Sequence, residues 1–237
     1  MKKWLFFAVS VCLLFLLVGV AASQEKREGY ITGKIVNGDS ENMSGWRIRF
    51  YDMKAGPTPF TTEYGRVPDF IARSEDDGVF KAKLPEGIYH MMALKKGPGK
   101  RLGPAGEGDL MYPPMDSTDP KAYVVKAGET TDIGVISGAV PFRKEWAVQV
   151  KTGIEGTVLD AEGKPVEGVL VFAALRPEVE IPLYASRDTD KDGKYVIGLP
   201  EGGQYYVSVW KEKPITVAVK RGEITQGIKI ILPARKR

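Results

Sequence analysis

The feature that most constrains the fold of this chain is an internal repeat. Four blocks of sequence occur twice in the same order: residues 31–36 and 154–159 (ITGKIV and IEGTVL), 45–50 and 168–173 (GWRIRF and GVLVFA), 77–87 and 192–202 (DGVFKAKLPEG and DGKYVIGLPEG), and 126–130 and 220–224 (KAGET and KRGEI). Such self-similarity indicates a supersecondary unit that has been duplicated. We therefore expect a first module over residues 28–137, a linker over 138–150 and a second module over 151–235.

The repeated blocks have the pattern of β-strands. In residues 46–51, Trp46, Ile48 and Phe50 alternate with more polar residues, which is the period of two that places one set on the core face. The Asp-Gly pairs at 77–78 and 192–193 lie between such segments and predict tight hairpins, because glycine adopts positive φ without steric cost. Short strands with a turn every 8–12 residues are typical of sandwiches. The sequence therefore predicts an all-β fold of two tandem Greek-key β-sandwiches.

The second copy also resembles a known family. Residues 156–160 (GTVLD), 163–169 (GKPVEGV), 189–195 (TDKDGKY) and 199–200 (LP) are similar to the carboxypeptidase regulatory-like domain. This resemblance implies a transthyretin-like sandwich of about seven strands per copy, grouped with the carbohydrate-binding-like folds. It implies an accessory role and does not imply peptidase activity, since a fold does not by itself fix a function. The first copy is more distant, because residues 37–44 replace the usual Gly-x-Pro-Val turn.

The first 23 residues have the pattern of a secretory signal peptide. Lys2 and Lys3 precede an apolar run over residues 4–20, and Ala21, Ala22 and Ser23 provide small residues for cleavage. We expect cleavage after residue 23 and a periplasmic or secreted protein. The alternative is an uncleaved N-terminal anchor, because the apolar run approaches the roughly 20 residues that span a bilayer.

Charge and composition exclude several classes of function. The net charge of +4 includes the two lysines of the signal peptide, so the rest of the chain is nearly neutral and does not suit nucleic-acid binding. The one cysteine lies within residues 1–23, and His90 is the one histidine. Zinc peptidases and serine triads need more such groups. We therefore expect no enzyme and no cofactor, with His90 partly exposed on the outer face of a strand.

One acidic segment copies the beginning of a calcium-binding loop. Asp188, Asp190 and Asp192 occupy the first, third and fifth positions, and a glycine follows at the sixth. The twelfth position, which should be a bidentate glutamate, is Leu199. Two interpretations stay open at this stage: a structural hairpin turn, or a weak calcium site that would make the protein a calcium-dependent adhesin.

Two long insertions distinguish the first module from the second. They cover residues 54–71 and 95–123, and loops of this length are usually functional or disordered. The second insertion joins basic residues to an apolar stretch stiffened by proline. We expect it to bind an envelope or extracellular protein partner through Lys100, Arg101, Leu110, Met111 and Tyr112.

A second candidate surface lies on the outer face of the strand at residues 205–210. Tyr206 and Trp210 could stack against the sugar rings of a cell-wall or extracellular polysaccharide, or the face could pack against the first module. The sequence as a whole predicts a non-enzymatic exported protein that binds partners or acts as a scaffold. A carbohydrate-binding module is the alternative.

Overall fold

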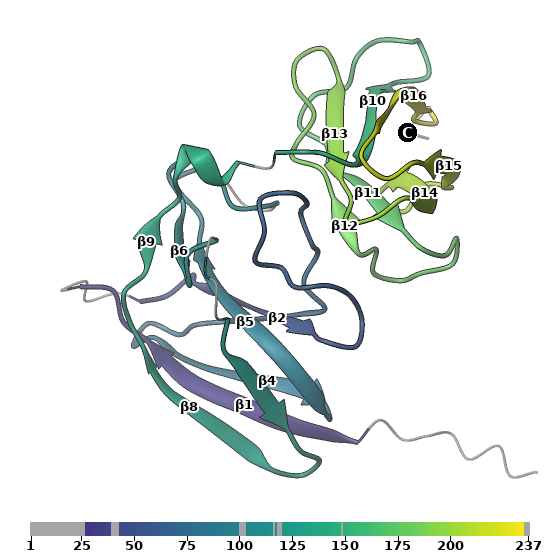
Figure 1. Ribbon diagram of the computed structural model, residues 1–237. Coiled ribbons are helices and arrows are strands. Elements are labelled where there is room, and N and C mark those ends of the chain that lie inside the picture. Colours follow the sequence, from purple (N-terminus) through teal and green to yellow (C-terminus); the bar gives the residue numbers. More distant parts are fainter. Residues whose placement is uncertain are drawn as a thin grey trace, which may run out of the picture.

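The computed structural model describes residues 27–38, 43–99, 103–115, 117, 120–147 and 149–234. These residues form two β-sandwiches in tandem (Figure 1), so the all-β prediction is confirmed. The predicted signal peptide lies outside the described residues. Within the ranges given above, no helix has the length and apolar character needed to cross a membrane.

The first sandwich consists of two sheets packed face to face. The smaller sheet has the strand order β4-β1-β8, and the larger has the order β3-β2-β5-β6-β9, with β7 also paired to β5. The strands are β1 (Glu28–Ile35), β2 (Arg47–Asp52), β3 (Phe70–Arg73), β4 (Val79–Pro85), β5 (Gly87–Lys95), β6 (Leu110–Tyr112), β7 (Ala122–Val125), β8 (Thr130–Ile136) and β9 (Val140–Pro141).

The second sandwich repeats this plan with fewer strands. Its sheets have the orders β13-β10-β16 and β12-β11-β14-β15. The strands are β10 (Gly153–Leu159), β11 (Val171–Ala174), β12 (Tyr184–Ala185), β13 (Lys194–Gly198), β14 (Gly203–Val209), β15 (Ile215–Val219) and β16 (Ile224–Ile231).

Each strand of the second sandwich has a counterpart in the first. β1 pairs antiparallel with β4 and parallel with β8, and β10 pairs in the same two ways with β13 and β16. Both parallel ladders contain a register shift near the middle of the central strand. Strands β6 and β9 have no counterpart among the described residues of the second sandwich, and both come from sequence that the second copy lacks.

Equivalent hydrogen bonds show that the copies agree in detail as well as in topology. The hydroxyl of Tyr89 donates to the Pro85 carbonyl at 2.9 Å. The hydroxyl of Tyr205 donates to the Glu201 carbonyl at the same distance and the same sequence separation. A tyrosine that folds back over its own hairpin in both copies supports a shared origin for the two sandwiches.

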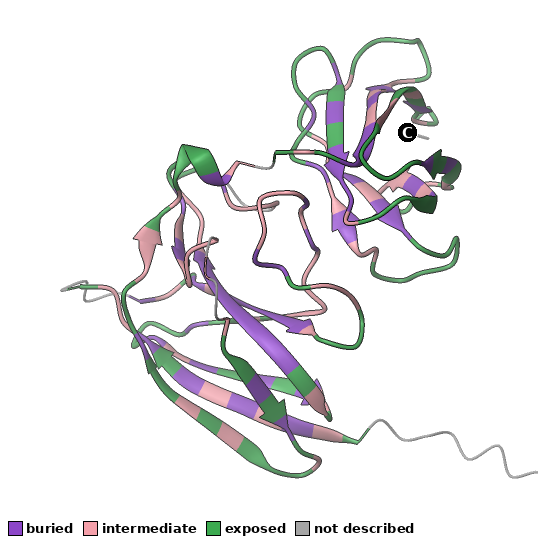
Figure 2. Ribbon diagram, in the orientation of Figure 1, coloured by how far each residue is buried: buried purple, intermediate pink, exposed green. Residues whose placement is uncertain are grey.

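Each sandwich has its own apolar core between its sheets. Trp46, Ile48 and Phe50 lie in the first core and are fully buried, as the alternation predicts. Figure 2 shows that burial extends along nearly all of β5, on both of its faces. Both faces of the larger sheet in the first sandwich are therefore covered.

The expected linker at residues 138–150 contributes to the first sandwich. Strand β9 pairs with β6, and the short 3₁₀ helix η1 (Lys144–Trp146) follows it. Trp146 is 2% exposed and packs on the outer face of the larger sheet. The chain therefore leaves the first sandwich as a packed segment.

The Asp-Gly turn at residues 192–193 connects β12 and β13, which lie in different sheets, so the predicted hairpin is corrected to a tight turn that joins the two sheets. Gly193 has φ of 70°, and a Cβ at this position would lie 2.5 Å from the Val158 carbonyl oxygen. We expect Gly193→Val to lower the free energy of unfolding by at least about 1 kcal/mol, because both backbone geometry and space exclude the side chain. Lys191→Ala, which changes an exposed residue, should have almost no effect. Equal effects of the two substitutions in chemical denaturation would contradict this turn.

Candidate functional site

The insertion at residues 95–123 is largely part of the fold. Lys100 and Arg101 lie outside the described residues. Leu110 and Tyr112 are half-buried in β6, and Met111 is fully buried. The expectation that Met111 contacts a partner is thus corrected: its side chain completes an apolar cluster beneath the insertion.

A buried ion pair organises this insertion. The ammonium of Lys96 lies 2.6 Å from Asp109 Oδ2, and its side chain is 8% exposed. Asp109 is fully buried and also accepts hydrogen bonds from the backbone N–H groups of Gly97 (2.8 Å) and Gly106 (2.9 Å). Burial acts to raise the pKa of Asp109, but these donors and the Lys96 charge outweigh it and lower the pKa. The loop is thus folded around one carboxylate.

The outer face of the larger sheet in the first sandwich is covered by this chain's own loops. We call this packing the outer cluster; it consists of Tyr51, Phe60, Met92, Leu94, Met111 and Trp146. His90 is 8% exposed beside it, with its ring edge-on to Phe60 at 5.7 Å between ring centres. The prediction that His90 is partly exposed is therefore wrong, because the insertion at residues 54–71 covers it.

The equivalent face of the second sandwich is open. We call Phe172, Tyr206 and Trp210 the aromatic face. Trp210 is 51% exposed and meets Phe172 edge-on at 5.6 Å between ring centres. Phe172 and Tyr206 are half-buried. The interpretation that Trp210 packs against the first module is contradicted by this exposure.

The first sandwich reaches into the second through the loop between β2 and β3, which we call the junction segment (residues 53–69). Tyr64 belongs to this loop, yet its ring lies in the core of the second sandwich, 5.8 Å from the ring of Tyr184. Backbone hydrogen bonds join Val67 N–H to the Leu183 carbonyl (2.8 Å) and Ala185 N–H to the Gly65 carbonyl (2.9 Å). The junction segment thus acts as a short extra strand at the edge of β12.

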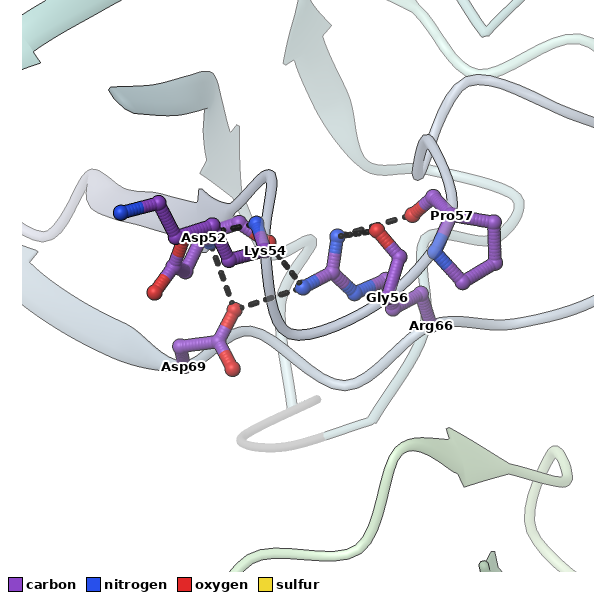
Figure 3. A network of polar contacts seen from close by, with 6 residues as sticks. All are labelled: Asp52, Lys54, Gly56, Pro57, Arg66 and Asp69. Atoms are coloured by element: carbon purple, nitrogen blue, oxygen red, sulfur yellow. Dashed lines mark hydrogen bonds and ion pairs between the residues drawn. The ribbon is translucent and has the colours of Figure 1, made fainter. Parts of the chain in front are cut away.

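Arg66 holds the junction segment in shape (Figure 3). Its side chain is fully buried, and it donates to the carbonyls of Asp52 and Pro57 and to Asp69 Oδ2, each at 2.8 Å. The guanidinium also lies over the Tyr51 ring at 5.4 Å. A planar guanidinium presents five donors in a fixed fork and so holds several acceptors of a loop in one geometry, whereas a lysine ammonium offers three rotatable donors on a single atom. Arg66 therefore fixes the path that carries Tyr64 across the junction.

Small residues and polar contacts complete the junction. A Cβ at Gly198 would collide with the backbone carbonyl of Glu63, so glycine is required for the sandwiches to approach. Arg187 donates to the Ala105 carbonyl at 3.3 Å and lies over the Phe142 ring at 5.5 Å. The contact therefore involves three separate parts of the first sandwich.

A cleft of about 720 Å³ remains beside this junction. We call it the edge cleft, because it follows β13 at the edge of its sheet. Its walls come from both sandwiches and from the connection between them. They consist of Gly65, Pro104, Ala147, Val150, Glu155, Ala185, Arg187, Asp188, Asp190, Lys194, Tyr195, Val196, Gly198 and Ile224.

The acidic segment at residues 188–192 has the hydrogen bonds of a turn. Asp190 Oδ1 accepts from the N–H groups of Asp192 and Lys194, each at 2.9 Å. In the part of the chain that the structure describes, no three or more acidic, histidine or cysteine side chains are grouped so as to hold a metal ion. The geometry of Asp188, Asp190 and Asp192 thus supports the interpretation as a structural turn.

Comparisons with known proteins leave the family open. No protein-family model matches the chain, and no curated protein matches it. Among solved structures, the TIE protein of Bacillus anthracis is 18% identical with a TM-score of 0.27, over 87% of this chain and 34% of that one. A streptococcal ancillary pilin is 11% identical with a TM-score of 0.28, over 90% and 64% respectively. The minor pilin GBS52 of Streptococcus agalactiae is 13% identical with a TM-score of 0.28, over 88% and 97%.

These similarities are too low to assign a family or a role. This chain spans about a third of the TIE protein and less than two thirds of the ancillary pilin. The resemblance to the carboxypeptidase regulatory-like domain is not confirmed by the family comparison. A function for this chain therefore has to be inferred from the junction between the sandwiches and from the surfaces beside it.

The buried ion pair predicts a loss of stability in acid. Folding lowers the pKa of Asp109, so the ionised carboxylate stabilises the folded chain at any pH above the pKa that Asp109 has in the unfolded chain. This stabilisation is lost below about pH 4, as the pH falls through the pKa of Asp109 in the folded chain. We expect Asp109→Asn to lower the free energy of unfolding near pH 7 by about 3 kcal/mol, since the buried Lys96 would lose the carboxylate charge beside it. The same substitution should make the free energy of unfolding depend less on pH below about 4.

The control is Glu129→Gln, which removes an exposed ion pair with Lys126 and should change little. Urea unfolding from pH 2.5 to 7 measures both variants. An acid dependence that is unchanged in Asp109→Asn would contradict the assignment.

Proposed function

We propose that this chain is an exported, non-enzymatic scaffold protein whose two sandwiches form one rigid unit. The observation that carries the proposal is Tyr64, a residue of the first sandwich that lies in the core of the second. Tandem domains usually move relative to one another unless their interface is large and apolar. Here a buried aromatic ring, an added strand and a buried arginine cross the junction, so bending would expose apolar surface.

Several features of the sequence support the exported and non-enzymatic parts of the proposal. Residues 1–23 have the pattern of a cleaved signal peptide, which would direct the protein to the periplasm or the exterior. The one histidine, His90, is buried beneath Phe60, where a substrate would not reach it. We further propose that the two copies are carboxypeptidase regulatory-like domains, with boundaries near residues 28–137 and 151–235 and the linker at 138–150.

A scaffold of this kind presents surfaces at a fixed spacing. The first sandwich covers its own outer face with the outer cluster, whereas the second leaves the aromatic face and the edge cleft accessible. The accessible surfaces thus lie on the second sandwich, and the first supplies the wall and the rigid support. An envelope or extracellular protein partner would bind there.

Rigidity is tested by nuclear magnetic resonance relaxation of the chain without residues 1–23. We expect both sandwiches to share one rotational correlation time, and Tyr64→Ala to give two shorter ones, because it removes the ring that joins the cores. The same variant should lower the free energy of unfolding of the second sandwich by about 3 kcal/mol. Lys151→Ala, which breaks an exposed ion pair with Glu63 at the same junction, is the control and should keep a single correlation time. Two times in the unmodified chain would contradict the proposal.

A second candidate function is glycan binding by the aromatic face. The specific observation in its favour is that Trp210 is 51% exposed and lies beside Phe172 on the aromatic face. Exposed aromatic rings on a flat sheet can stack against the apolar faces of sugar rings. We expect Trp210→Ala to abolish binding to cell-wall polysaccharide while the melting temperature changes little.

Isothermal titration with soluble cell-wall fragments measures this binding. Ile231→Ala, which alters another exposed apolar side chain of the second sandwich, should bind as the unmodified chain does. Absence of any binding by the unmodified chain would remove this candidate.

A further inference from the structure

Strand β13 is the terminal strand of its sheet, and its outer edge opens into the edge cleft. It lies on the flank of the second sandwich where the connection from the first arrives (Figure 1). In most proteins a free edge of this kind is blocked, because unpaired backbone groups invite another strand. The way in which this edge is left open therefore needs a physical explanation.

The hydrogen-bond pattern shows which backbone groups point into the cleft. Val158 N–H donates to the Gly193 carbonyl at 2.8 Å, which fixes the alternation of the β10–β13 pair. In an antiparallel pair every second residue bonds to the neighbouring strand, so Tyr195 and Ile197 face β10. The N–H and C=O groups of Val196 consequently point to the free edge. The Val196 side chain is 41% exposed.

The corresponding edge of the first sandwich is protected in a different way. In β4 the residues that match Val196 and Gly198 in the repeat are Lys81 and Lys83, and both are exposed. Lysines on an edge strand oppose pairing with another chain, because their charges would have to be desolvated. The second sandwich has replaced both lysines, one by an apolar residue and one by glycine. The edge of β13 has thus lost its protection where the cleft lies.

Contacts at both ends limit what can pair with this edge. At one end, the Lys194 carbonyl already accepts a hydrogen bond from Asp190 N–H at 3.1 Å. At the other end the Glu63 carbonyl presses against Gly198. The unpaired part of the β13 edge is centred on Val196, and it is too short to pair with the long edge strand of another sheet. It matches a short extended segment of polypeptide.

The charges of the cleft favour a basic flank on that segment. Three carboxylates (Glu155, Asp188 and Asp190) and two cations (Arg187 and Lys194) line it. The carboxylates thus outnumber the cations by one, and Arg187 is already held by a hydrogen bond to the Ala105 carbonyl at 3.3 Å. The walls are otherwise apolar, as at Val150, so they suit an apolar side chain at the centre of the segment.

We propose that the edge cleft binds a short extended peptide segment of a partner protein, which adds a strand to β13. Peptide addition to a sheet edge gains affinity from main-chain hydrogen bonds and specificity from side-chain contacts. The junction segment already pairs with the β12 edge of this sandwich in the same manner. The inference deepens the proposed scaffold role by naming a class of partner. The role itself would survive its failure, because rigidity is measured without any ligand.

The test uses a phage-displayed library of random nine-residue linear peptides, selected on the chain without residues 1–23. We expect selected peptides to carry an apolar residue next to a basic one and to bind at least about ten-fold more weakly to Val196→Pro. Proline removes the N–H that faces the cleft but leaves the pairing with β10 intact. The matched control is Val196→Thr, which keeps the N–H and the branched side chain and should bind within about three-fold.

A measurement on the unmodified chain keeps the proposal testable if Val196→Pro does not fold. In the free chain, the amide hydrogen of Val196 should exchange quickly with solvent. With a selected peptide bound, this exchange should be at least about ten-fold slower. Failure to select peptides, equal losses in both variants, or an unchanged exchange rate for Val196 would each overturn the proposal. Binding of a soluble polysaccharide that is lost in Val196→Pro would overturn it as well, since the cleft would then recognise sugars.

Discussion

The arrangement of this molecule depends on one buried arginine. Arg66 binds backbone carbonyls at the start of the junction segment and the carboxylate of Asp69 at its end, and burial raises the pKa of that carboxyl despite the charge beside it. Such a pair adds little net stability relative to apolar packing, but removing one partner is costly. Its physical effect is to select one loop path. That path places Tyr64 in the second core and turns two sandwiches into one body.

Duplication followed by divergence at the surface accounts for the differences between the copies. In the first sandwich, Phe60 and Trp146 come from an insertion and from the connection, and they cover the sheet face that the second sandwich leaves open. The second sandwich has instead acquired glycine at 198, where the Glu63 carbonyl requires it. The insertions thus serve packing within this chain first, and the surfaces left for other molecules lie mainly on the copy without insertions.

The sequence predicts the sheets well and the loops poorly, for a physical reason. Alternation at Trp46, Ile48 and Phe50 and glycine at 193 are local patterns, and local patterns determine strands and tight turns. They do not determine which strands pair, and the strands on either side of Gly193 lie in different sheets. Met111 looked like an exposed anchor because nothing near it in sequence shows that Lys96 and Asp109 pair beneath the loop. Tyr64 gave no signal either, since its partners lie more than 100 residues away in sequence. Contacts of that range cannot be read from one sequence without an observed structure.

An unpaired strand edge can also cause unwanted association between copies of a chain, and the junction between the sandwiches restricts access to this edge. A free strand carrying Val196 would invite pairing between copies of this chain, because its apolar side chain has replaced the lysine found in the first copy. The first sandwich stands over this edge through Gly65 and Pro104, which line the cleft, and Glu63 closes one end. In the proposed binding mode, a single extended segment pairs with β13 between these walls. A rigid junction would then also make an unprotected strand edge tolerable, so that the proposed rigidity and the proposed peptide binding would have the same structural origin.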